Sequence, residues 1–380
     1  MRIMWKDRLC IVMAIEHYNP LGAIRSLGEA GVEPVFIAIK GRGKFASASK
    51  YISKVHYVDS VEEGYETLLQ EYGDVAEKTG VKPFLFSSDD KDIGYLDLHY
   101  DELKDKFTCF NAGVNGRINE FMDKNNILEL AKKHGLNVLE ARVCQRGEIP
   151  EGLGYPVITK SISPIVGGWK SDVHICHNEE ELVEAYKSIE APTVLVQKYI
   201  EKKNEYAIEG FAANTGKDVL FAISNTYNYL LPDYYSPYMT VRPVDIEYIR
   251  KSLKGMFAEI GFEGIFEVEF LIADDGTFYF LEINFRNSTW SYAATKAGMP
   301  LPVLWAETQD QGYLREDAQK DFEPFMAMVE PIDYAKRVRT GKIDVAEWLK
   351  DFKEAKCGYY YSADDLEPWR ICVQNWDQLG

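Results

Sequence analysis

Residues 264–286 read GIFEVEFLIADDGTFYFLEINFR, and this stretch decides how the chemically interesting part of the chain folds. Phe266 to Ile272 and Thr277 to Ile283 are rich in β-branched and aromatic residues, which favour strands. Residues 273–276 between them, ADDG, have the composition of a tight turn. The stretch therefore predicts a β-hairpin.

Polar side chains of this hairpin gather on one face. Side chains two apart in a strand share a face, so Glu267 and Glu269 point together, as do Glu282 and Asn284. Folding back at the turn can bring Glu269 level with Glu282, and two such carboxylates repel unless a cation lies between them. All-oxygen ligands favour Mg²⁺ over Zn²⁺, and Arg286 on the Asn284 face suits a phosphoryl oxygen. The hairpin alone is equally compatible with an exposed acidic face that binds nothing.

Bulk composition narrows the class of protein. The 380 residues are 46% hydrophobic, enough for a real core and for two or three domains. The formal net charge of −17 argues against a nucleic-acid-binding surface, although a nucleotide site needs only a few local cations. The six cysteines are scattered with no CxxC motif, and no run approaches the ~20 apolar residues of a membrane span. We therefore expect reduced thiols and a soluble protein in the cytoplasm.

The N-terminal part of the chain has a β-α-β pattern. Leu9 to Ile15 and Val35 to Ile39 are predicted strands, and Leu21 to Ala30 is a predicted helix. This order is typical of a parallel sheet with helices on its faces. The loop between Glu16 and Gly22 lacks the G-x-G-x-x-G motif, which argues against NAD binding.

A further strand end supplies a candidate substrate contact. Phe84 to Phe86 form a predicted strand, and Asp89, Asp90 and Lys91 follow it. Loops at the carboxyl ends of strands line the ligand crevice of an open α/β sheet, so Asp90 is a candidate for binding substrate. The alternative is that these residues cap and begin a helix.

Two lysines stand where an anion can be met. A helix is predicted from Asn119 through His134, and Lys124 lies in its opening turns, where the amide groups attract anions. Lys160 ends a predicted strand and precedes a loop that contains Gly167 and Gly168, an arrangement that suits a phosphate clamp. Each lysine taken alone is also explained as a surface residue.

The middle of the chain contains two further predicted strands, Thr193 to Ile200 and Glu205 to Ala212. The segment 174–177, HICH, crowds its candidate ligands into one strand, so a structural strand explains it better than a metal site. Residues 225–244 are dense in tyrosine and proline and are a candidate cover for a second substrate, with Arg242 pairing a carboxylate. A packed surface loop or an interface explains them equally well.

Four segments, in this order, resemble the ATP-grasp superfamily. They are the Asp-Lys helix start at Lys124, the sequence YPVITK that ends at Lys160, VLVQKYIEKKNEYAIEGF at 194–211, and the hairpin with its E-x-N-x-R end. The resemblance runs from about residue 119 to residue 305. It implies an α/β N-terminal parallel-sheet domain (1–116), an α+β ATP-grasp domain with two subdomains closing over ATP (117–310, lid about 145–200), and a short C-terminal extension (311–380). That extension is expected to pack on the catalytic domain or on a second subunit of a homodimer.

The resemblance also implies roles for individual residues. Those expected to bind ATP are Lys124, Lys160, Gly167, Gly168, Gln197, Lys198, Ile200 and Glu205. Those expected to bind two Mg²⁺ ions, with Mn²⁺ as an alternative, are Glu269, Glu282 and Asn284. Arg286 is the expected catalytic residue on the transferring phosphoryl group. The sequence departs from the family at Phe285, where Pro or Thr is common, and in a flap that is poorer in glycine.

These features together predict an ATP-dependent carboxylate–amine ligase. Phosphorylation of a carboxylate gives an acyl phosphate that an amine can attack, with release of ADP and phosphate and without a nucleophilic Ser or Cys. The resemblance is to the subgroup of D-aspartate ligases and carbamoyl-phosphate-synthase-like proteins, which implies an amino acid substrate. The alternatives are another ATP-grasp reaction, such as carboxylation or phosphoryl transfer, and a non-catalytic ATP-binding regulator.

Overall fold

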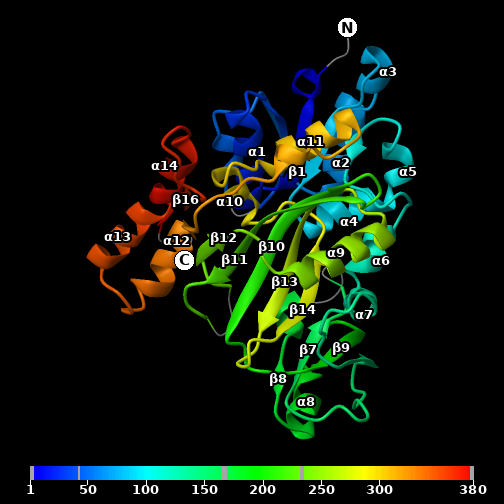
Figure 1. The fold of residues 1–380 in the computed structure, drawn as a ribbon, viewed down its shortest axis with the longest axis vertical. Coiled ribbons are helices and arrows are strands. Elements are labelled where there is room, and N and C mark those ends of the chain that lie inside the picture. The colour runs from blue at the N-terminus through cyan, green and yellow to red at the C-terminus, as the bar shows by residue number, and fades with distance from the viewer. Residues whose placement is uncertain (1–3, 42, 164–168, 232–234, 377–380) are drawn as a thin grey trace.

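The computed structural model describes residues 4–41, 43–163, 169–231 and 235–376. Within these residues the strands form three sheets (Figure 1). No helix of this described part is both long and apolar enough to cross a membrane.

The first sheet is parallel and five-stranded, with the order β3-β2-β1-β4-β5. Its strands and helices are β1 (Cys10–Ile15), α1 (Tyr18–Glu29), β2 (Val35–Ile39), β3 (Lys54–Val58), α2 (Val61–Tyr72), α3 (Val75–Thr79), β4 (Phe84–Ser87), α4 (Asp90–Leu98), α5 (Tyr100–Leu103) and β5 (Thr108–Cys109). Alternate residues of β1 pack into two different cores, Ile11 on one face and Val12 on the other. The predicted parallel-sheet domain is therefore confirmed.

Two predicted helix starts are wrong. α1 begins at Tyr18 rather than Leu21, because Pro20 stands in its first turn, where a missing amide hydrogen is harmless. The single helix predicted from Asn119 is two helices, α6 (Arg117–Met122) and α7 (Lys124–Lys133). Asp123 separates them, because it takes an extended conformation and its carboxylate caps α7.

The second sheet is antiparallel and four-stranded, with the order β6-β9-β7-β8. It consists of β6 (Ala141–Gln145), β7 (Val157–Ser161), β8 (Ile175–Cys176) and β9 (Thr193–Lys198), with α8 (Glu179–Ala185) beside it. The HICH segment contributes β8, and His174 Nε2 lies 2.9 Å from the Ser171 carbonyl oxygen and 3.1 Å from the Ser188 hydroxyl. The structural interpretation of that segment is therefore supported.

The third sheet has seven strands in the order β14-β13-β10-β11-β12-β15-β16. Its strands are β10 (Asn204–Ala213), β11 (Asp218–Tyr227), β12 (Tyr238–Arg242), β13 (Gly264–Ile272), β14 (Phe278–Asn284), β15 (Phe325–Met328) and β16 (Cys357–Gly358). The accompanying helices are α9 (Glu247–Ile260), α10 (Ser291–Lys296), α11 (Leu301–Gln311), α12 (Glu330–Arg337), α13 (Val345–Glu354) and α14 (Glu367–Gln374). The predicted hairpin is confirmed as β13 and β14.

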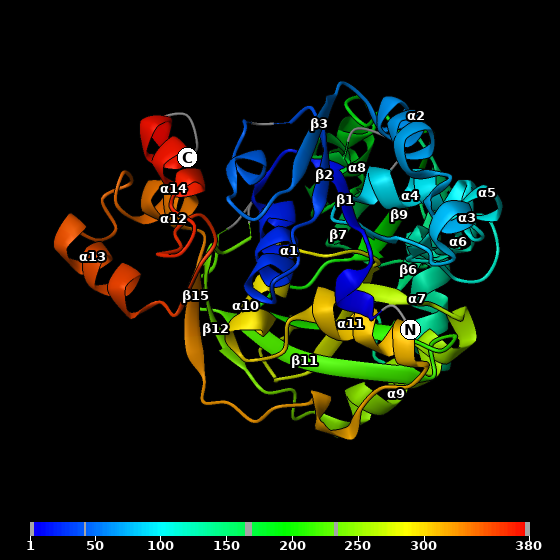
Figure 2. The ribbon, with the colours of Figure 1, turned by 90° about the horizontal axis from the view of Figure 1, so that it is seen from above.

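Two sets of contacts connect the residues beyond 311 to the rest of the molecule. β15 pairs with β12 and β16 pairs with β15, so residues beyond 311 extend the large sheet. Arg25 of α1 is fully buried, and its guanidinium donates to the Asp365 carboxylate at 2.9 Å and to the carbonyl oxygens of Tyr359 and Tyr360. Figures 1 and 2 accordingly show α12–α14 at one side of the molecule.

Candidate active site

The hairpin aligns its polar side chains as the sequence predicted. In the β13–β14 ladder Glu269 lies opposite Glu282, and Glu267 lies opposite Asn284. The Asn284 amide donates to both β13 carboxylates, at 3.0 Å to Glu267 and 2.9 Å to Glu269. A register shift directly after Glu269 gives β14 one extra residue there, a bulge of the kind that re-aims neighbouring side chains.

Lys124 reaches this cluster from the first residue of α7. Its Nζ lies 2.9 Å from Glu282 Oε2. Burial alone would lower the pKa of Lys124, but the Glu282 carboxylate more than offsets it, so the pKa is raised. The same attraction to Lys124 lowers the pKa of Glu282. Lys124 and Glu282 are therefore both charged in the folded protein.

Lys160 approaches from the smaller sheet. It lies on β7, where its Nζ is 3.3 Å from Gln197 Oε1 on β9. Burial lowers the pKa of Lys160, against the opposing attraction of Glu282 and, more weakly, of Glu269. The two lysines predicted to hold phosphates thus face the same pair of carboxylates from two separate elements.

The carboxylates of β13 repel one another. The pKa of Glu269 is raised well above its usual range by burial and then by Glu267 and Glu282. A divalent cation beside Glu269 would reverse this, because it favours the ionised form.

The candidate ligands suit a hard cation that completes its coordination shell with water or phosphate oxygens. In the described residues no three His, Cys, Asp or Glu side chains form a complete ligand cluster. Glu269, Glu282 and the amide oxygen of Asn284 are all-oxygen ligands, and Mg²⁺ usually keeps water and phosphate oxygens in its shell. These residues therefore fit Mg²⁺ bound together with a nucleotide.

Arg286 links the β13–β14 hairpin to the start of α4. Its guanidinium donates to both Asp90 oxygens, at 2.7 and 3.1 Å, and to Asn284 Oδ1 at 3.2 Å. Burial would lower the pKa of Arg286, but Asp90 outweighs it and raises the pKa. Asp89 caps α4 by accepting from the Lys91 amide, as the alternative interpretation expected, while Asp90 reaches the site.

The remaining residues predicted to bind ATP differ in where their side chains lie. Gln197 is buried and faces Lys160, whereas Lys198 lies on the other face of the small sheet and donates to the carbonyl oxygens of Gly154 and Tyr155. Ile200 is half-buried just beyond the end of β9. Glu205 is the second residue of β10 and forms an ion pair with Lys202. Gly167 and Gly168 lie outside the described residues.

The ladder does not bring Arg242 to the site. Glu269 pairs with Ala207 of β10, Ala207 with Asn225 of β11, and Asn225 with Val241 of β12. Arg242 follows Val241 and therefore points to the opposite face, where it donates to Thr226 at 2.8 Å. The expectation that Arg242 pairs a substrate carboxylate is thus corrected: sequence alone did not fix the face on which it lies.

Two residues on the carboxylate face escaped the sequence analysis. Glu209 is fully buried opposite Glu267 in the β10–β13 ladder, and its carboxylate accepts from the hydroxyls of Ser288 and Ser291 at 2.7 Å each. Burial raises the pKa of Glu209 to about 7. Tyr227 stands near Glu205, and burial raises the pKa of its phenol. The even spacing of Glu205 and Glu209 along one strand was the available signal for Glu209.

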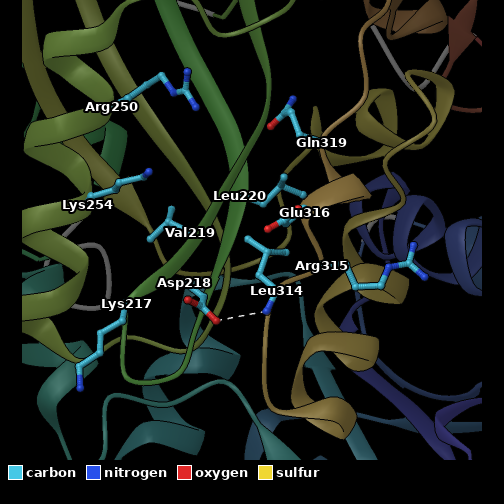
Figure 3. Close-up of a pocket in the computed structure, with 10 residues that line it drawn as sticks. All are labelled: Lys217, Asp218, Val219, Leu220, Arg250, Lys254, Leu314, Arg315, Glu316 and Gln319. Carbon is cyan, nitrogen blue, oxygen red and sulfur yellow. Dashed lines mark hydrogen bonds between the residues drawn. The ribbon is translucent and has the colours of Figure 1, made fainter.

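A separate hollow of about 300 Å³ lies at the far end of β11 from Asn225. Figure 3 shows Arg250 and Lys254 of α9 on one side of it and Glu316 and Gln319 on the other. It contains none of the residues predicted to bind ATP or metal, and it is not part of the candidate site.

Residues 121–309 match the family model described as the carbamoyl-phosphate synthase L chain, ATP binding domain. The 2-oxoglutarate carboxylase small subunit of Hydrogenobacter thermophilus is 25% identical over 252 residues, which cover 62% of this chain and 49% of that protein. The mitochondrial methylcrotonoyl-CoA carboxylase subunit alpha of Dictyostelium discoideum is 27% identical over 151 residues, which cover 35% of this chain and 20% of that protein. The chain thus spans half the length or less of these curated relatives.

Solved structures share the fold. L-amino acid ligase from Bacillus licheniformis has a TM-score of 0.65 at 14% identity, over 85% of this chain and 80% of that one. N5-carboxyaminoimidazole synthetase from Staphylococcus aureus has a TM-score of 0.64 at 16% identity, over 90% and 88%. The biotin carboxylase domain of Hydrogenobacter thermophilus 2-oxoglutarate carboxylase, in complex with MgADP, ADP and bicarbonate, has a TM-score of 0.61 at 18% identity, over 84% and 74%.

Proposed function

We propose that this chain, whose residues 121–309 match the carbamoyl-phosphate synthase L chain ATP binding domain, is an ATP-grasp enzyme and acts as an ATP-dependent carboxylate–amine ligase. The observation that carries the proposal is the convergence of Lys124 and Lys160 on the paired carboxylates Glu269 and Glu282, with Arg286 beside them. A chain that only bound a nucleotide would have no use for the whole set.

The proposed roles follow from charge and reach. Lys124 and Lys160 would bind the phosphates of ATP, and Glu269, Glu282 and Asn284 would hold Mg²⁺. Bound there, Mg²⁺ would neutralise the phosphates during transfer. The adenine would lie along the end of β9 near Ile200, which follows the buried Gln197.

The proposed reaction has two steps. A carboxylate oxygen of the first substrate attacks the γ-phosphorus of ATP, the bond to the β-phosphate oxygen breaks, and ADP leaves. The amine of the second substrate then attacks the acyl carbon of the acyl phosphate, the carbon–oxygen bond breaks, phosphate leaves, and the nitrogen releases a proton to solvent. Arg286 would stabilise the charge on the transferring group, with Asp90 holding its guanidinium in place.

Isotope transfer tests the acyl phosphate directly. With ¹⁸O in the carboxylate substrate, one label is expected in the released phosphate, because that oxygen bridges carbon and phosphorus in the intermediate. Phosphate without label would refute the step. Candidate substrates come from a screen of paired amino acids for phosphate release with ATP and Mg²⁺.

A second candidate is an ATP-dependent carboxylation with bicarbonate. It is favoured by the two curated relatives, both of which are carboxylase subunits. The two reactions separate in bicarbonate-depleted buffer: a ligase releases ADP in proportion to added amine, whereas a carboxylase releases ADP only when bicarbonate is restored.

A further inference from the structure

Asn225 of β11 carries a buried side-chain amide. It is 2% exposed, and within the described part of the chain neither its Oδ1 nor its Nδ2 has a hydrogen-bond partner. Buried amides are almost always hydrogen-bonded, because a buried amide without partners loses its hydrogen bonds to water and gains none in the protein. Such a side chain indicates a partner that is supplied from outside the chain.

The sheet register places Asn225 on the face that carries the chemistry. It pairs with Ala207 of β10, which in turn pairs with Glu269 of β13. Side chains at paired positions share a sheet face, so Glu269, Ala207 and Asn225 form one row across three strands. Its chain neighbour Thr226 points to the other face, where it accepts from Arg242.

Ala207 stands between the two polar ends of this row. Ala207 has only a methyl group as its side chain. It is partly exposed, although its strand neighbours Tyr206 and Ile208 are buried. A group bound over Ala207 would lie between Glu269 on one side and Asn225 on the other.

Asn225 and Lys124 lie on opposite sides of Glu269. Lys124 pairs with Glu282 on β14, which neighbours β13 on the side away from β10. Asn225 thus lies across β13 and β10 from Lys124. The occupant of the row over Ala207 is more simply a second substrate than the phosphate chain of ATP.

We propose that Asn225 is a specificity-determining residue for the amine substrate, and that this substrate is an α-amino acid. A primary amide donates through Nδ2 and accepts through Oδ1, so it fits a group that carries both kinds of partner. The carboxylate of an amino acid accepts from Nδ2, while its amino group donates to Oδ1 and is held near the reacting centre beside Glu269. This inference rests on the proposed ligase function and deepens it.

The test measures amino-acid binding and thermal stability in single-residue variants of β11. Asn225→Leu keeps the size of the side chain but removes both polar atoms. Asn225→Asp keeps an acceptor oxygen, replaces the donating Nδ2 by a second oxygen, and adds a charge that repels a carboxylate. Thr226→Val is the matched control, because it alters the neighbouring residue on the opposite face. Binding of each common L- and D-amino acid is measured by calorimetry on the full chain saturated with MgADP, so turnover is not needed.

We expect at least one amino acid to bind the parent protein and Asn225→Leu to weaken that binding tenfold or more, with the MgADP affinity kept within about twofold. We also expect Asn225→Leu to raise the melting temperature without amino acid, because an unsatisfied buried amide has been removed. If Asn225 had a structural role, the Asn225→Leu substitution would lower the melting temperature instead. Asn225→Asp should weaken binding as well, and Thr226→Val should change neither quantity.

The inference is overturned if no amino acid binds the parent protein, if Asn225→Leu binds it unchanged, or if that variant loses MgADP affinity alone. The outcome also separates this inference from the ligase proposal. Binding that depends on Asn225 without any phosphate release would end the ligase proposal and leave the site standing. Amine-dependent phosphate release that is indifferent to Asn225→Leu would do the reverse.

Discussion

Replacing Asp365 by alanine should destabilise the protein strongly, because it leaves the fully buried Arg25 guanidinium without its counter-ion. Removing one partner of a buried pair costs about 3–5 kcal/mol. The Asp365 carboxylate also accepts from the Ser49 hydroxyl at 2.8 Å and the Lys50 amide at 2.9 Å, which adds about 1 kcal/mol for donors left unpaired. The expected loss in unfolding free energy is therefore about 4–6 kcal/mol.

The assay is guanidinium unfolding followed by tryptophan fluorescence, since Trp348, Trp369 and Trp376 all lie in the C-terminal residues. The control is Glu367→Ala, two positions further along, whose ion pair with Arg370 is exposed and contributes less than about 1 kcal/mol. The double variant Arg25→Met with Asp365→Leu should lose less than Asp365→Ala, because no charge then stays buried. A loss below about 1 kcal/mol in Asp365→Ala would refute the reasoning.

Three other outcomes follow from the site. Lys124→Met should weaken MgADP binding at least tenfold by calorimetry, whereas Lys132→Met, an exposed change on the same helix, should leave it unaltered. Glu282→Gln should reduce the rise in melting temperature that Mg²⁺ and ADP together produce, because a metal ligand loses its charge. The pKa of Glu209, about 7 when folded and ~4.3 when unfolded, means that its contribution to stability is full below pH ~4 and is lost as pH rises through 7. Urea unfolding in EDTA should therefore show a smaller decline between pH 4.5 and 8 in Glu209→Gln than in the parent protein; an equal decline would contradict the assignment.

The hairpin was predictable because its evidence is local. Alternation along Phe266–Ile272 predicts the strand, and residues 273–276 predict the turn. The exact pairing of Glu269 with Glu282 also depends on the one-residue register shift after Glu269, which the alternation does not reveal. The positions of Lys124 and Lys160 relative to that pair came from the family resemblance, since nothing local relates α7 or β7 to β14.

Features that depend on distant partners were not predictable in the same way. The Asp123 break was missed because helix-favouring residues continue across it, and only its capping geometry ends one helix and starts the next. The face on which Arg242 lies could not be predicted, because the pairing of β12 with β11 is fixed by the fold and not by residues 238–242 themselves. Asp90 and Arg286 are 196 residues apart in the sequence, and no local pattern around either residue predicts their ion pair.

The pairing of β15 with β12 bears on how the protein tolerates shortening. A fragment that stopped near residue 310 would keep every ATP-binding and metal-binding residue proposed above, yet it would leave β12 with a row of open amide and carbonyl groups along its outer side. Such an unprotected rim recruits other chains by strand addition. We therefore expect a fragment that ends near residue 310 to aggregate more readily than the full chain, because β15 covers the edge of β12.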